Sequence, residues 1–246
     1  MKKSIVVTTS LCLVAVCVVF AIGGYTAAVA EQRKVPIYSV DTPQNHLSIS
    51  FDAAWGADKT KQILDICDQY NVKATFFLVG FWVDKFPDMV QEIARRGHEI
   101  GTHSQTHPQM SKLSHKQVTS ELEVSCNKIV ALTNQPVTVF RAPFGDYNNQ
   151  LLDVAQSLGL YTIQWSVDSL DWKGLSAQQI ADRVVKAQRG DIILCHNNSD
   201  HITQALPAIF AALQSKGLTF VPIGQLIYKT NYTVDHQGVQ HSTQSA

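Results

Sequence analysis

The sequence predicts one α/β domain in which about seven strand–helix units form a barrel. Apolar segments that favour strands alternate with segments of helical periodicity through most of the 246 residues. This alternation is typical of a parallel sheet covered by helices. The segment 74–79 is almost entirely apolar, as expected for a strand that is buried on both faces. Seven or eight such units suit a barrel better than an open sheet, and the chain is long enough for one barrel.

Short apolar runs that end at polar residues or glycine mark the strands. The first of them ends in an acid, Asp52, and the sixth is followed by His196. In chain order, the strands are expected at 47–52, 74–79, 99–102, 137–140, 161–165, 191–195 and 218–221.

Helical segments are marked by apolar residues three or four positions apart and by signals at their ends. Pro87 lies in the first turn of one helix, and Gly97 follows its last turn. Ser114 with Gln117 forms a capping-box pattern at the start of another helix, and Ser176 caps a third. In chain order, the helices are expected at 59–70, 87–96, 114–130, 149–158, 176–188, 205–216 and 223–228.

Composition divides the chain into four parts. Residues 1–30 carry Lys2 and Lys3 before a long apolar run, a pattern typical of a cleaved signal peptide or of an uncleaved membrane anchor. The run is longer than the apolar region of most signal peptides, which favours the anchor, whereas cleavage would fall near Ala30. The remaining parts are expected to be a linker at 31–44, the folded domain at 45–230 and a flexible tail at 231–246.

The net charge of the chain and its N-terminal leader indicate which partners to expect. Lysine and arginine number 20, as do aspartate and glutamate, so the formal net charge is zero. Nucleic-acid-binding domains usually carry a basic surface, so we expect no nucleic-acid partner. Both forms of the leader predict an exported domain, because Lys2 and Lys3 would stay on the cytoplasmic side.

Ionisable residues follow five of the expected strands, and in α/β barrels the active residues gather at those carboxyl ends. Each residue alone has an ordinary explanation, since an aspartate after a strand is a frequent turn residue and a single histidine is more often packed than a ligand. Their joint placement predicts one site. In chain order they are Asp52, His103, His107, Arg141, Asp168, Asp171 with Trp172, and His196.

These residue types indicate hydrolysis. His103 and His107 are four positions apart, so one helical turn would place both imidazoles on one side, where they suit zinc or a related divalent ion. A carboxylate beside such a site can accept a proton from water, and a separate imidazole can protonate a leaving amine. An arginine next to the carboxylate would keep it ionised and oriented.

Five motifs, in their order along the chain, resemble those of the polysaccharide deacetylases with a NodB homology domain, carbohydrate esterase family 4. The motifs are Ser-Phe-Asp52-Ala53, His103-Ser-Gln-Thr-His107, Arg141-Ala-Pro-Phe144, Asp168-Ser-Leu-Asp171-Trp172 and Leu194-Cys-His196. The resemblance covers the chain from Asn45 to Tyr228. It implies a distorted (β/α)7 barrel and removal of N-acetyl groups from amino sugars in peptidoglycan or chitin-like polymers.

The resemblance also implies a role for each matching residue. Asp52 would be the general base, oriented by and paired with Arg141. His196 would be the general acid, tuned by Asp168. The residues implied to contact the substrate are Phe144, Asp171, Trp172 and Leu194.

The implied metal site departs from the family pattern at one position. His103 and His107 would hold a divalent metal, expected to be Zn²⁺. Family members usually have a second acid directly after the base, but this chain has Ala53, which has no donor atom. Two imidazoles alone should bind metal weakly. The motif around Asp52, with the leader and the short chain, is most similar to that of the sporulation-associated members.

The expected function is therefore a hydrolase that removes N-acetyl groups from a cell-wall polysaccharide such as peptidoglycan, in spore or cell-wall modification. The intact acid–base residues favour catalysis. Ala53 supports the alternative, a catalytically weak or inactive glycan-binding wall protein on the same fold. The expected partners are the polysaccharide and, through the N-terminal segment, the membrane.

Overall fold

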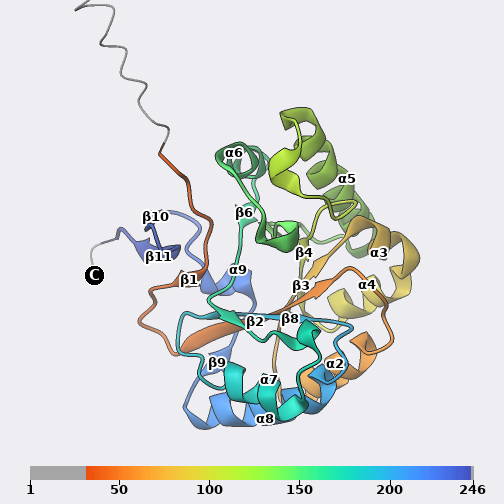
Figure 1. The fold of residues 1–246 in the computed structure, drawn as a ribbon, viewed down its shortest axis with the longest axis vertical. Helices are drawn as coiled ribbons and strands as arrows, with labels where there is room; N and C mark the ends of the chain where they lie inside the picture. Colours follow the sequence, from red (N-terminus) through yellow and green to blue (C-terminus); the bar gives the residue numbers. More distant parts are fainter. Residues whose placement is uncertain (1–31, 245–246) are drawn as a thin grey trace, which may run out of the picture. The chain divides into compact units, whose positions relative to one another are not determined.

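A parallel sheet organises the protein in the computed structural model, which describes residues 32–244 (Figure 1). The strands follow the order β6-β5-β4-β3-β2-β8-β7, and β9 pairs with β2 off this path. Every pairing in this sheet is parallel, as the sequence predicts. The strands are β2 (His46–Ala53), β3 (Thr75–Leu78), β4 (Glu99–Thr102), β5 (Val139–Phe140), β6 (Tyr161–Thr162), β7 (Val167–Asp168), β8 (Ile192–His196) and β9 (Thr219–Phe220).

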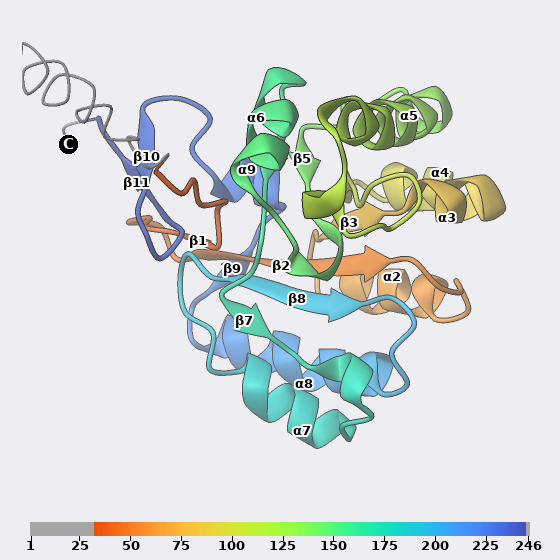
Figure 2. The ribbon, with the colours of Figure 1, turned by 45° about the horizontal axis from the view of Figure 1, so that its top comes forward.

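Helices cover the sheet, and α7 and α8 lie next to each other beneath β2 and β8 in Figure 2. The capping boxes form at Ser114 with Gln117 and at Ser176 with Gln179. The short helix α3 was not expected from the sequence. The helices are α2 (Thr60–Gln69), α3 (Gly80–Lys85), α4 (Pro87–Arg95), α5 (His115–Thr133), α6 (Asn149–Ser157), α7 (Ala177–Val184), α8 (Ile202–Ser215) and α9 (Ile223–Leu226).

The prediction of a distorted (β/α)7 barrel is confirmed in part. In the part of the chain that the structure describes, the parallel sheet is curled into a half-barrel that does not close, because its edge strands, β6 and β7, do not pair with each other. The segment at Ile37 lies against this edge: its N–H donates to Thr162 O at 3.0 Å, and its carbonyl accepts from Gln164 N–H at 2.7 Å.

Short segments within the expected linker at 31–44 and the expected flexible tail at 231–246 pair with each other in a second sheet. Its order is β1-β11-β10, with β1 (Ser39–Val40), β10 (Tyr232–Val234) and β11 (Val239–Ser242). The buried Gln240 of β11 ties this sheet to the chain after α9, accepting from Tyr228 N–H at 2.9 Å and donating to Tyr228 O at 2.7 Å. Polar composition alone suggested disorder, whereas pairing between the two ends satisfies their backbone groups.

The expected leader at 1–30 lies outside the described residues. Within 32–244, no helix is both long enough and apolar enough to span a bilayer.

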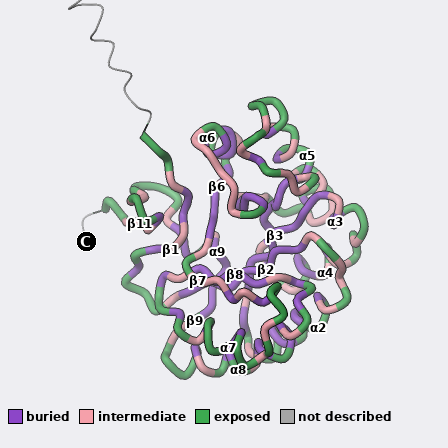
Figure 3. The backbone as a smooth tube through the Cα atoms, in the orientation of Figure 1, coloured by how far each residue is buried: buried purple, intermediate pink, exposed green. Residues whose placement is uncertain are grey.

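The buried residues follow the strands and the inner sides of the helices, as Figure 3 shows. On β2, Phe51 stacks on Phe76 of β3 with ring centroids 5.1 Å apart, inside the main hydrophobic core. Successive side chains on a strand point to opposite faces. The alternation therefore turns Ser50 and Asp52 to the other face, where the polar side chains gather.

Candidate active site

A pocket of about 720 Å³ opens at the carboxyl ends of the parallel strands. It is lined by every residue that the sequence singled out as a site residue, except Arg141, which lies beneath it. In the sheet, Asp52 of β2 is the direct neighbour of His196 of β8. The expected convergence of the acid–base residues on one face of the fold is therefore confirmed.

Asp52 and Arg141 form a buried ion pair at the floor of this pocket. Arg141 Nη1 donates to Asp52 Oδ1 at 2.8 Å and to Ser50 Oγ at 2.8 Å, and its Nη2 donates to Gln164 O at 3.0 Å. The guanidinium is fully buried and lies 4.2 Å from the centre of the Phe77 ring. Four contacts thus fix a charge that has no access to water, and the carboxylate is its counter-ion.

Opposing effects set the ionisation of Asp52. Burial alone would raise its pKa, but the charge and hydrogen bond of Arg141 hold the pKa below the usual value. Asp52 is therefore an ionised carboxylate at neutral pH, with one oxygen held by Arg141 and the other facing His103.

The ring of His103 is oriented by the backbone. His103 Nδ1 lies 2.8 Å from Arg141 O, and since a carbonyl only accepts, Nδ1 carries the proton. The other nitrogen, Nε2, is left with its lone pair and lies 3.6 Å from Asp52 Oδ2. Burial lowers the pKa of His103, so the neutral ring is favoured. In the neutral ring, the lone pair of Nε2 is free to bind a metal or to accept a hydrogen bond.

The histidine loop, residues 103–107, is not the helical turn that the sequence suggested. Ser104 and His107 have positive φ angles of 69° and 59°, which a helix excludes. The two imidazoles nevertheless meet, with ring centroids 4.9 Å apart. Glu121 of α5 stabilises the loop, because its carboxylate accepts from the N–H groups of Gln105 and Thr106 at 2.9 and 2.8 Å and from the Thr106 hydroxyl at 2.7 Å. Sequence analysis missed Glu121, since nothing in the sequence links it to this loop.

His196 is held by Asp171, whereas Asp168, which was expected to tune it, acts on it only through a smaller effect of charge. Asp171 Oδ1 lies 2.8 Å from His196 Nδ1, and Asp171 Oδ2 accepts from the His196 backbone N–H at 2.8 Å. Burial lowers the pKa of His196, but the hydrogen bond and charge of Asp171, together with smaller effects of the charges of Asp52 and Asp168, raise the pKa above the usual value. Asp168 Oδ1 instead accepts from Leu170 N–H at 2.8 Å, within its own turn.

The residues expected to contact the substrate form the pocket walls. Leu194 of β8 is buried among them, while Phe144 and Trp172 are 68% and 60% exposed. Phe144 lies at φ 60° in the short 3-10 helix Pro143–Gly145, and its ring centroid is 4.6 Å from that of His107. Asp171 was also expected to contact the substrate, but both of its carboxylate oxygens are hydrogen-bonded to His196.

The side chains present supply only part of a metal site. His103 and His107 offer two imidazoles, the donors that zinc prefers. Ala53 is fully buried in the main hydrophobic core and offers none. Asp146, a possible substitute, is bonded to Ser111 N and Oγ and does not line the pocket, nor does Asp58. Across residues 32–244, no three His, Cys, Asp or Glu side chains are grouped closely enough to hold a metal. These residues therefore do not fit a complete catalytic metal site.

The pocket is also lined by residues that the sequence analysis did not identify as site residues. One of them is Trp55, three positions after Asp52; a tryptophan so close to the acid at a strand end is the sequence signal that could have identified it. The others are Ala54, Ala142, Gly145, Trp165, Gly174, Asn198, Ser199 and Asp200.

The geometry agrees with comparisons to known proteins. A family model described as polysaccharide deacetylase matches residues 39–163. The chain belongs to this family. Among its relatives, an uncharacterized protein of Bacillus subtilis is 31% identical over 196 residues, which are 79% of this chain and 61% of that protein. A peptidoglycan-N-acetylglucosamine deacetylase of Bacillus cereus is 34% identical over 193 residues, 76% of this chain and 70% of that protein.

Solved structures of other polysaccharide deacetylase family members share the fold. A pseudoenzyme of carbohydrate esterase family 4 from Bacillus anthracis has a TM-score of 0.76 at 32% identity, over 79% of this chain and 69% of that one. A mutant of the same protein is described as having restored enzymatic activity. The chain spans 61% of the Bacillus subtilis relative, so the activity of a whole relative is not transferred to it directly.

Proposed function

We propose that the protein is a hydrolase that removes N-acetyl groups from the amino sugars of peptidoglycan or a related cell-wall polysaccharide. The observation that carries the proposal is the pairing of Asp52 and His196 as neighbours on β2 and β8. Arg141 keeps the carboxylate ionised, and Asp171 raises the pKa of the imidazole. The carboxylate is suited to accept a proton from water, and the protonated imidazole is suited to donate one to the leaving amine.

The names of the relatives support the substrate class, since one of them is a peptidoglycan-N-acetylglucosamine deacetylase. The proposal includes a zinc ion at His103 and His107, held weakly because two imidazoles are its only protein donors. It also includes export of the domain by the leader at 1–30, attachment to the membrane, and a role in spore or cell-wall modification. The apolar leader and the motif around Asp52 support these points.

A second candidate is a glycan-binding protein with little or no catalysis. Two observations favour it: Ala53 removes a metal donor, and a relative of similar fold is a pseudoenzyme. Pure binding, however, needs no buried ion pair beside an imidazole whose pKa is raised by a carboxylate. We therefore place catalysis first.

Acetate release from peptidoglycan and from N-acetylated glycan oligomers, with zinc supplied, tests the proposal. Asp52→Asn and His196→Ala should each lose about 10²–10⁴-fold in rate, and the losses should not add because both groups serve one proton-transfer sequence. Asp84→Asn removes a carboxylate that pairs with Lys128 outside the pocket and should leave the rate unchanged. Wild-type protein that releases no acetate would favour the binding protein, and full activity in Asp52→Asn would refute the mechanism.

A further inference from the structure

The exposed aromatic side chains of residues 32–244 are concentrated at the pocket. Only five large hydrophobic side chains in this part of the chain are classed as exposed, and the three aromatic ones, Trp55, Phe144 and Trp172, all line the pocket. The other two, Val124 and Val130, lie on α5. Exposed aromatic surface is costly in water and is informative about binding when it is concentrated at one place.

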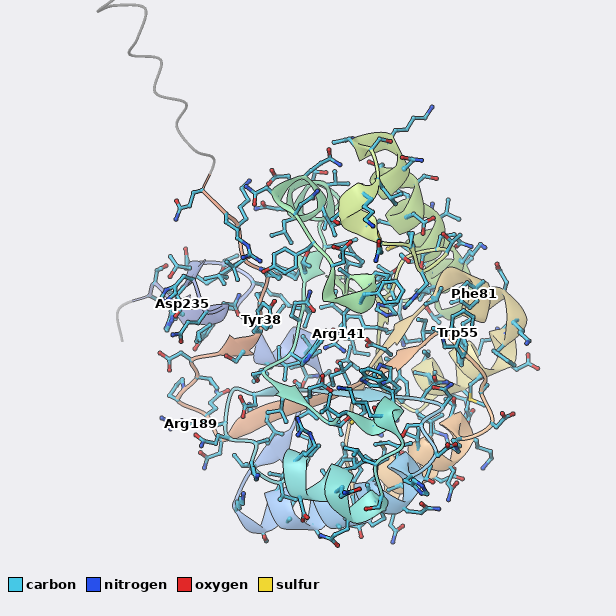
Figure 4. The ribbon with its side chains drawn as sticks, in the orientation of Figure 1. Tyr38, Trp55, Phe81, Arg141, Arg189 and Asp235 are labelled. Atoms are coloured by element: carbon cyan, nitrogen blue, oxygen red, sulfur yellow. The ribbon has the colours of Figure 1, made fainter. Side chains whose placement is uncertain are left out.

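Trp55 packs against a neighbouring ring although 62% of it is exposed. Its ring centroid lies 5.3 Å from that of Phe81 on α3, and Figure 4 shows the two rings close together. The next residue, Gly56, accepts hydrogen bonds through its carbonyl from Trp82 Nε1 at 2.7 Å and Asn197 Nδ2 at 2.9 Å. The loop is therefore fixed before any ligand arrives, so stacking on Trp55 would cost little conformational entropy.

Trp55 and Trp172 flank the acid–base residues. Trp55 packs on α3, which follows β3, whereas Trp172 follows β7, and β2 and β8 lie between β3 and β7 in the sheet. A ligand that reaches both indoles must therefore extend beyond the group that lies over Asp52 and His196. A single sugar whose acetyl group is held between these two residues would leave one aromatic surface without a partner.

The polar lining indicates the chemistry of this ligand. The pocket lining also includes the hydrogen-bonding side chains of Asp168, Asn198 and Asp200. Carboxylates accept from hydroxyl groups, and amides both accept and donate. A hydroxyl-rich ring with apolar C–H faces, that is, a pyranose in a glycan chain, matches both the polar and the aromatic side chains of the lining.

We propose that Trp55 is a stacking platform for a second sugar, next to the one whose acetyl group lies over Asp52 and His196, so that the site selects glycan chains over single sugars. The proposal rests on the proposed function for the identity of the first sugar. It is independent of catalysis, because the platform would serve a glycan-binding protein equally.

Calorimetric titration with N-acetylglucosamine and with its β-1,4-linked pentamer tests the platform. Wild-type protein should bind the pentamer more tightly than the monomer. Trp55→Ala should lose about tenfold in pentamer affinity, equal to about 1.4 kcal/mol, and leave monomer affinity unchanged. Trp55→Phe should retain part of the preference, and Val130→Ala, which removes exposed apolar surface outside the pocket, should retain all of it. Circular dichroism and melting temperature would confirm that each variant is folded.

The outcomes separate this proposal from the proposed function. Equal pentamer affinity in wild type and Trp55→Ala, or equal affinity of wild type for monomer and pentamer, would overturn the platform even if acetate is released. Loss of the length preference in Trp55→Ala with no acetate release from wild type would establish the platform and reject the deacetylase.

Discussion

The ion pair between Asp52 and Arg141 makes a quantitative prediction about stability. In Asp52→Asn the guanidinium, which is fully buried, would lose its counter-ion. Removing one partner of a buried pair typically costs about 3–5 kcal/mol. Arg141 keeps its bonds to Ser50 and Gln164, and the asparagine oxygen remains an acceptor, so we expect the lower end, about 3 kcal/mol. For a chain of this size, that corresponds to a melting temperature lower by about 6–12 °C.

Urea and thermal denaturation at neutral pH measure this loss. Asp168→Asn is the matched control, because it removes a carboxylate of the same pocket that is not hydrogen-bonded to a buried cation, and it should change stability by no more than about 0.5 kcal/mol. Arg141→Met in the Asp52→Asn background should cost less than the two single losses together, since both charges leave the interior.

The pH dependence gives an independent check. The folded pKa of Asp52 lies below its ordinary value of 3.8, so its contribution is present above that pH and is lost as the pH falls through the folded pKa. The stability difference between wild type and Asp52→Asn should therefore shrink in acid. A difference within about 0.5 kcal/mol at neutral pH would refute the view that the pair is charged and buried.

Three further predictions follow from the contacts of the site. Asp171→Asn should lower the pKa of His196 in an NMR titration by more than Asp168→Asn does, because Asp171 supplies a hydrogen bond and charge whereas Asp168 supplies charge alone; a larger effect of Asp168→Asn would restore the assignment made from the sequence. Glu121→Gln should speed hydrogen exchange at the histidine loop and lower the free energy of unfolding by about 1–3 kcal/mol, because a charged acceptor of three hydrogen bonds is lost. Unchanged hydrogen exchange would show that the loop keeps its conformation without Glu121. Ala53→Asp should destabilise the metal-free protein, and zinc should restore its stability and bind more tightly than to wild type by calorimetry; equal zinc affinity would mean that the new carboxylate faces the core.

The sequence alone determined the parallel sheet, the order of its elements and most of the side chains of the site. This is because buried strands, caps and helix ends depend on residues near one another in the chain. The capping boxes at Ser114 and Ser176 form where they were expected, and Asp52 and His196 lie at the carboxyl ends of β2 and β8, within one residue of the expected strand ends. The apolar face of each strand is set by alternation, so the same pattern that buries Phe51 turns Asp52 toward the pocket.

Only the tertiary structure decided which groups touch. Asp168 and Asp171 are three residues apart and chemically alike, and the turn at Leu170, with φ 51°, brings Asp171 rather than Asp168 to His196. The open sheet, the pairing of the two ends into β1-β11-β10 and the support of the histidine loop by Glu121 all depend on contacts between distant segments. Local sequence patterns carry no signal for such contacts, because each residue type there is ordinary for its own neighbourhood.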